Sequence, residues 1–204
     1  MISTALKSDT RLLSTLLRGF RIPYVALAGI AVFALLLVLP DTWVLPQTLA
    51  EFPVRAPVAS TIAAWLASLV LIAAMTEPVD AIDWTVNRHM GLIRSARIVL
   101  TAAFLLLMLT APAPQYASIS AVTFLTLTGE CLLMARWAPL STVWTLPSAH
   151  VLASVIFGAQ RIDGTAPWAW IIKSEMQPID IAISAALFAT GLSLWARATI
   201  SRVS

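Results

Sequence analysis

The chain has 204 residues, of which 59% are hydrophobic and 11% are charged, with a formal net charge of +3. A soluble domain usually carries about twice that charged fraction, so the composition argues against a water-soluble protein and predicts an all-α, polytopic membrane protein. The positive charge flanks apolar runs, which indicates a topology signal rather than nucleic-acid binding. The single cysteine, Cys131, excludes an intrachain disulfide and is expected to be a buried thiol.

The first 21 residues form a segment of their own. We expect residues 1–21 to contain an amphipathic helix in the inner membrane interface; a simple cytoplasmic extension of the first span is the alternative. A cleaved signal peptide fits less well, because the following apolar run is long and no small-residue cleavage pattern comes after it. The apolar stripe at helical spacing consists of Leu12, Leu13, Leu16, Leu17 and Phe20.

Six apolar segments follow, and most approach the roughly 17–25 residues that a spanning helix needs. They are Ile22–Leu39, Pro57–Met75, about Ile98–Ala113, Ala117–Met134, Ala138–Ala159 and Ile179–Ala196. We therefore expect about six transmembrane helices in a single membrane domain, residues 1–204. The third segment is short unless its helix begins near Arg94. The fifth is interrupted by Pro147 and His150, so five spans with this segment on the surface are the alternative.

The distribution of basic residues predicts the orientation. If the N-terminus lies inside, only Arg55, Arg161 and Lys173 of the 13 Lys and Arg residues fall in outer segments, which leaves ten in inner ones. This bias follows the positive-inside rule. We expect a multi-pass protein of the cell (inner or plasma) membrane with both termini in the cytoplasm.

The segment Thr76–Arg97 holds a dense charge cluster between the second and third spans. Asp80 and Asp83 come early and Arg94 and Arg97 come late, an order that suits a helix dipole. Its apolar residues recur every three or four positions, as on one face of a helix. We expect a short cytoplasmic helix parallel to the membrane, over about Pro78–Arg94, with a solvated loop as the alternative. The apolar stripe consists of Val79, Ile82, Val86, Met90 and Ile93.

This cytoplasmic segment is also our candidate for a partner contact, because its acids fit a protein partner better than an anionic lipid surface. Trp84 lies off the main stripe and is free to face the partner while the stripe rests on the membrane. The candidate partner-contact residues are Asp80, Ile82, Asp83, Trp84, Val86, Arg88 and Met90.

Glu130 is the acid inside the fourth apolar segment. Ionisable residues in a membrane span are costly and are by default functional candidates. Ser120, Thr123, Thr126 and Glu130 share one helical face. We expect this face to point into the protein or a water-filled cavity. Thr123, Thr126 and Glu130 are candidates for a transport pathway or a subunit seam; the alternative is a carboxyl group bonded to a neighbouring helix.

No motif in the sequence nominates an enzyme. There is no G-x-x-x-x-G-K-[ST] to cradle phosphates, no G-x-S-x-G and no H-E-x-x-H. We expect His89 and His150 to be interfacial or packed rather than ligands, and we expect no catalytic residue, metal or cofactor. Any ATP hydrolysis would have to occur in a partner chain.

The order of these elements resembles the membrane subunit of a type-2 (ABC-2-like) ABC transporter, of the exporter kind. The resemblance rests on an interfacial N-terminal helix, two spans, the charged loop "EPVDAIDWTVNRHMGLIRSAR", three spans, an outer segment and a last span. It implies that the charged loop, residues 76–97, carries a coupling helix that docks on a separate ATP-binding subunit. It also implies a second membrane subunit, as a homodimer or heterodimer, with the lipid bilayer as surroundings.

The resemblance extends to the outer segment, residues 160–178, "QRIDGTAPWAWIIKSEMQP", which it implies to be re-entrant or helical. Trp168 and Trp170 are natural interface anchors in it. Two other functions stay open. One is a non-transporting integral membrane partner, such as an assembly or immunity factor. The other is the substrate-binding membrane subunit of an ATP-driven importer.

Overall fold

The computed structural model describes residues 22–39, 43–44, 55–56, 58–75, 90–160, 164–173 and 175–201. This part of the chain is predominantly helical, which confirms the all-α class. The α-helices are α2 (Ile22–Val38), α3 (Val58–Met75), α4 (Met90–Thr110), α5 (Ala117–Trp137), α6 (Thr145–Phe157) and α7 (Pro178–Ser201). The 3-10 helices are η2 (Pro114–Tyr116) and η3 (Pro167–Ile172).

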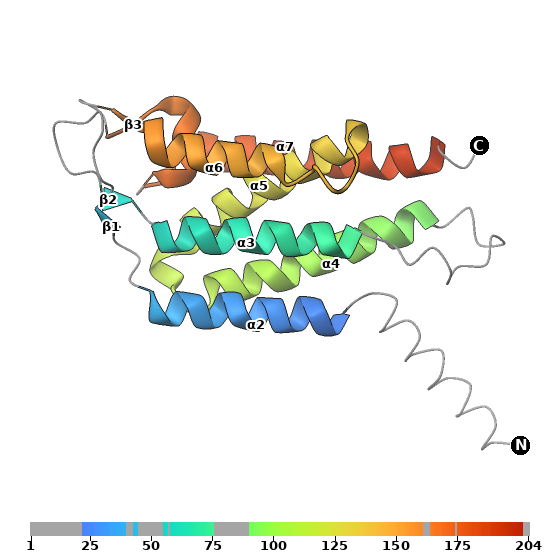
Figure 1. Ribbon diagram of the computed structural model, residues 1–204, viewed down its shortest axis with the longest axis horizontal. Coiled ribbons are helices and arrows are strands. Elements are labelled where there is room, and N and C mark those ends of the chain that lie inside the picture. The colour runs from blue at the N-terminus through green and yellow to red at the C-terminus, as the bar shows by residue number, and fades with distance from the viewer. Residues whose placement is uncertain are drawn as a thin grey trace, which may run out of the picture.

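Two short antiparallel strand pairs complete the described elements. β1 (Trp43–Val44) pairs with β2 (Arg55–Ala56), and β3 (Ala159–Gln160) pairs with β4 (Gly164–Thr165). Both pairs lie at the same end of the molecule, which we call the strand end (Figure 1). In the chain, β1 and β2 lie between α2 and α3, and β3 and β4 lie between α6 and η3.

The helices form an antiparallel bundle in which successive helices run in opposite directions (Figure 1). The end of α3, the start of α4 and the end of α7 lie together at the end opposite the strands. α5 is central, since it contacts α3, α4, α6, α7 and η3. Its largest interface is with α7.

Helix lengths support the six-span expectation only in part. Among the described residues, two helices are long and apolar enough to cross a membrane, over Pro114–Trp137 and Pro178–Arg197. Four further apolar helices are shorter: Pro23–Val38, Val58–Ala73, Ser95–Thr110 and Thr145–Phe157. The third apolar segment begins its helix at Met90, well before Ile98, which gives α4 its length of 21 residues.

The fifth apolar segment differs most from its expected form. Its helix, α6, has 13 residues, which at 1.5 Å each make about 20 Å, less than the roughly 30 Å of a hydrocarbon core. Pro147 lies in the first turn, where its missing N–H costs no helical hydrogen bond. The preceding residues form turns instead, in which Thr142 N–H donates to the Pro139 carbonyl at 2.9 Å. This segment is therefore not one continuous span-length helix.

Several predicted features lie outside the described residues. These are the N-terminal helix over residues 1–21 and six of the seven candidate partner-contact residues: Asp80, Ile82, Asp83, Trp84, Val86 and Arg88. The seventh, Met90, is the first residue of α4. Residues 90–94, the last part of the expected docking helix, are the first residues of α4.

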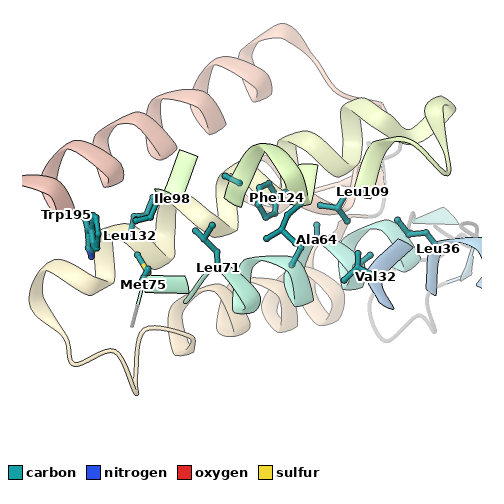
Figure 2. Close-up of a cluster of buried hydrophobic side chains, with 14 residues drawn as sticks. Val32, Leu36, Ala64, Leu71, Met75, Ile98, Leu109, Phe124, Leu132 and Trp195 are labelled. Carbon is teal, nitrogen blue, oxygen red and sulfur yellow. The ribbon is translucent and has the colours of Figure 1, made fainter. Parts of the chain in front are cut away.

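The main core is apolar and joins five helices (Figure 2). Its labelled side chains are Val32 and Leu36 of α2, Ala64, Leu71 and Met75 of α3, Ile98 and Leu109 of α4, Phe124 and Leu132 of α5, and Trp195 of α7. A second cluster connects α5, α6 and η3 through Leu127, Val151, Ala166, Ala169, Ile171 and Ile172. The 3-10 segment η3 is therefore part of the packed interior.

Large apolar side chains also cover the outside of the bundle. Tyr24 and Val38 of α2 and Leu100 of α4 are each at least 70% exposed. Exposed apolar surface, where it forms large patches, usually marks a membrane or protein contact. Further exposed examples are Leu27, Ile30, Leu37, Leu107, Leu152, Phe157 and Ile179.

Candidate functional site

A row of polar residues on α5 faces the interior. Ser120, Thr123 and Thr126 are at most 1% exposed, and the Glu130 side chain is 12% exposed. These residues share one face of α5 because they follow one another at steps of three or four. The face that the sequence indicated as polar thus points into the protein, where α6, α7 and η3 meet it. We call this region the polar seam.

Glu130 contacts a histidine from the next helix. His150 Nδ1 of α6 lies 2.5 Å from Glu130 Oε1, and the two side chains are 14% and 12% exposed. The other ring nitrogen, Nε2, lies 3.2 Å from the backbone oxygen of Trp168 in η3. The imidazole also meets the Trp170 ring edge-on, with centroids 5.6 Å apart. His150 therefore bridges three elements.

Glu130 is only half satisfied by this contact. Its second carboxyl oxygen, Oε2, is buried and has no hydrogen-bond partner among the described residues. A buried carboxylate normally accepts several hydrogen bonds, and an unmet one costs free energy. One oxygen of the Glu130 carboxyl group therefore lacks the hydrogen bond that burial normally requires.

Thr126 is a second junction in the polar seam. Its hydroxyl lies 2.7 Å from the Ser184 hydroxyl of α7, where either group can donate. The Trp170 indole N–H donates to the same Thr126 oxygen at 3.1 Å. One side chain of α5 thus ties down both α7 and η3.

The backbone of η3 is held by two more threonines. The hydroxyls of Thr61 in α3 and Thr123 in α5 donate to the Ile171 carbonyl, at 3.1 and 3.2 Å. A buried carbonyl at the end of a helix needs such partners because no further helical turn supplies them. These hydrogen bonds explain how η3, with a backbone carbonyl that its own helix does not satisfy, lies inside an apolar bundle.

An ion pair connects the end of η3 to the start of α7. Lys173 Nζ donates to both carboxylate oxygens of Asp180, at 2.9 and 3.1 Å. Asp180 is 3% exposed and also accepts from the Gln177 backbone N–H at 3.0 Å. An acid in the first turn that reaches back to a free N–H stabilises a helix start. The pair therefore anchors both α7 and η3.

The two outer tryptophans differ from the expected pair of interface anchors. Trp168 is 44% exposed, but Trp170 is partly buried and its N–H is used inside the polar seam. The reason is the 3-10 geometry of η3, which turns Ala169, Ile171 and Ile172 into the second core cluster. Within the predicted outer segment, residues 160–178, the structure has the 3-10 helix η3 over Pro167–Ile172.

No described group of three or more His, Cys, Asp or Glu residues is arranged to hold a metal ion. Cys131 is fully buried, as expected for a structural thiol. Among the described residues of this region, the polar contacts are hydrogen bonds, the Glu130–His150 contact and the Lys173–Asp180 ion pair.

Thr123, Thr126 and Glu130 are brought together on the polar seam, but the sequence interpretation missed their partners. His150 was expected to be packed or interfacial, and it is the residue that meets Glu130. A signal existed in the sequence, because two ionisable residues in successive apolar segments are expected to pair. The Trp168 carbonyl and the Trp170 indole N–H carried no comparable signal.

Comparison with protein-family models, with curated proteins and with solved structures found no match to this chain. The functional interpretation therefore depends on the residues and the geometry described above.

Proposed function

We propose that this protein is the membrane subunit of an ATP-driven transporter, of the exporter class, which works with a separate ATPase chain and a second membrane subunit. The observation that carries the proposal is the polar seam itself. It places a buried acid–imidazole pair and a helical outer segment inside a bundle whose outside is apolar.

The first argument is the free energy that it costs to bury the ionisable pair of the polar seam. An ionisable pair inside an apolar bundle costs free energy that a purely structural helix contact avoids, so its presence favours a functional role. The outer segment also supports the proposal. In η3, a backbone carbonyl and an indole N–H are bonded by threonines of α3 and α5, which makes this segment an integral part of the bundle.

The source of energy is the second argument. The sequence has no phosphate-binding motif, so energy for transport would have to enter through a protein contact. The predicted cytoplasmic helix that leads into α4 supplies a candidate. Ile82, Trp84, Val86 and Met90 are its candidate anchors, since apolar and aromatic residues carry most of the free energy of an interface.

A non-transporting membrane partner is the second candidate function, and one observation favours it. The hydroxyls of Thr123 and Thr126 are engaged in bonds within the chain, to Ile171 and Ser184 among others. Internally paired groups suit tight helix packing as well as they suit a pathway. The two functions differ in whether an ATPase subunit is bound.

The test is purification of the full chain from its native membranes in a mild detergent, with identification of bound chains and an ATPase assay. We expect a near-stoichiometric chain with a phosphate-binding motif, together with ATP hydrolysis. Asp83→Ala/Trp84→Ala should weaken its binding roughly thirtyfold, as expected for loss of an anchor that contributes about 2 kcal/mol.

The matched control is Asp41→Ala/Trp43→Ala, which removes the same residue types from a predicted outer loop. It should leave recovery unchanged. Wild-type recovery by the Asp83/Trp84 variant would exclude the docking helix. A purified protein with no nucleotide-binding chain would exclude the transporter and favour the non-transporting partner.

A further inference from the structure

Three elements meet at one imidazole ring. His150 of α6 contacts Glu130 of α5 through Nδ1 and the Trp168 carbonyl of η3 through Nε2. The chemistry of these atoms fixes where hydrogens must be. A backbone carbonyl oxygen only accepts, so Nε2 must carry a hydrogen for the bond to Trp168 to form.

The hydrogen count at the other nitrogen follows from this. If Nδ1 carries a second hydrogen, it donates to a Glu130 carboxylate; if it carries none, it accepts from a protonated Glu130 carboxyl. In both arrangements a single proton lies between Nδ1 and Oε1, whose separation is 2.5 Å. In the first arrangement the bond is charge-assisted, and such bonds are shorter and stronger than bonds between neutral groups.

Loss of this proton is incompatible with the three-way contact. With the hydrogen kept on Nε2, the lone pair of Nδ1 would face a carboxylate oxygen and the Glu130 contact would be repulsive. With the hydrogen moved to Nδ1, the ring would keep Glu130 but would have no hydrogen for the Trp168 carbonyl. In either case α5, α6 and η3 are no longer held by one ring.

We propose that Glu130 and His150 form a proton-binding site, and that the proton bound there holds η3 in the bundle. The unpartnered Glu130 Oε2 supports this, because after loss of the shared proton, with the remaining hydrogen kept on Nε2, neither oxygen of the carboxylate would be bonded. The ligand of this site is a proton. When the proton is bound, η3 stays packed in the bundle, and when it is lost, η3 loosens. This inference does not depend on an ATPase partner.

The surrounding titratable groups do not replace this pair. α3 and η3 contain no titratable residue, and His150 is the one in α6. In α5 the neighbours are the buried Cys131 and Arg136, which is six residues and about 9 Å further along the axis. The Lys173 ammonium beyond η3 is bonded to Asp180 of α7.

Release is expected to be local. The Glu130–His150 pair reaches the backbone of η3 at the Trp168 carbonyl, whereas Thr61 and Thr123 hold the Ile171 carbonyl through hydroxyls that do not titrate in this range. Proton loss should therefore loosen the start of η3, around Trp168 and Ala169, while the end of η3 and the bundle persist. Buried residues of η3 should become accessible before the protein unfolds.

The experiment measures thiol accessibility in the purified full chain in detergent. Ala169→Cys places a reporter at a fully buried position of η3, directly after Trp168, in a Cys131→Ala background. A bulky maleimide is reacted between about pH 5.5 and about pH 9, a range that spans imidazole titration. The rate is divided by that of an exposed Glu175→Cys reporter, which removes the intrinsic pH dependence of thiol reactivity.

We expect the normalised rate to rise about tenfold or more toward high pH, since a hydrogen bond to a charged group is lost. Glu130→Gln should abolish the rise and keep the reporter protected at high pH. The reason is that the carboxamide NH₂ donates permanently to Nδ1 and leaves the Nε2 hydrogen for Trp168. Glu175→Gln removes an exposed acid near η3 and should keep the wild-type response.

Two results would overturn the proposal: a flat profile in the unsubstituted pair, or an unchanged rise in Glu130→Gln. If Glu130→Gln does not yield folded protein, His150→Asn is measured instead. Its amide N–H replaces Nδ1–H but cannot bind a proton in this range, so its profile must be flat. A wild-type rise in His150→Asn would equally refute the proton site.

Discussion

The two sides of the bundle are built by different means. α2 and α4 pack on each other and on α3 through apolar side chains such as Val32, Leu36 and Leu105. α5, α6, α7 and η3 meet through hydroxyls, an acid–imidazole contact and an ion pair. We call these the apolar side and the polar side.

The glycines show the same difference. On the apolar side, a Cβ at Gly29 of α2 would meet the Phe104 ring of α4 at 2.6 Å, and a ring can rotate away. On the polar side, a Cβ at Gly129 of α5 would meet backbone atoms of Leu187 and Phe188 in α7 at 2.8 Å. Backbone cannot yield without separating the helices. The apolar side therefore tolerates variation, whereas the polar side specifies one arrangement.

The largest expected effect separates these two glycines. Gly129→Ala should lower the free energy of unfolding by about 2 to 3 kcal/mol, because overpacking against backbone outweighs the roughly 1 kcal/mol gained in helix propensity. Gly29→Ala is the matched control and should change it by less than about 1 kcal/mol. Denaturant titration of the two purified variants measures both. Equal losses would show that the two sides do not differ in this way.

The ion pair should come next. Lys173→Met should lower the free energy of unfolding by about 2 kcal/mol, because it leaves the buried Asp180 carboxylate with the Gln177 N–H alone. Adding Asp180→Asn to Lys173→Met should recover part of the loss, since the unpaired charge is then removed. If the double variant had a lower free energy of unfolding than Lys173→Met, the loss would not come from an unpaired Asp180 charge, and this account would be contradicted.

The smallest effect tests a single hydroxyl. Thr126→Val keeps the shape of the side chain but removes the partner of Ser184 and Trp170, at a cost of about 1 kcal/mol. Thr190→Val, on the exposed face of α7, is the control and should have an effect near zero. The same loss in both variants would mean that the junction at Thr126 is not a specific contact.

The sequence predicted where most helices begin better than it predicted their lengths and their contacts. Apolar runs near Ile22, Pro57 and Ala117 begin within a residue of α2, α3 and α5, because hydropathy reports directly on helical segments. The fifth segment was predicted too long. Its composition is mainly apolar, but Pro147 lies in the first turn of α6 and the residues before it form hydrogen-bonded turns.

The contacts of the polar seam were less predictable. The spacing of Thr123, Thr126 and Glu130 shows which residues share a face, but it does not show which helix they face. The meeting of Glu130 with His150 depends on the relative depth of α5 and α6, which the turns after Trp137 determine. The position of η3 depends on hydrogen bonds that join its carbonyls and its indole to side chains of three other helices, α3, α5 and α6. No local sequence pattern predicts those contacts.

The most direct test of the account is the sidedness of the bundle in a membrane. One reporter is fused after Ser204, beyond α7, and another is inserted at Asp163, between β3 and β4. The positive-inside bias predicts that the Ser204 reporter is cytoplasmic and that the Asp163 reporter lies on the opposite side. Signals from the same side would contradict the six-span membrane subunit and the placement of η3 at its outer face.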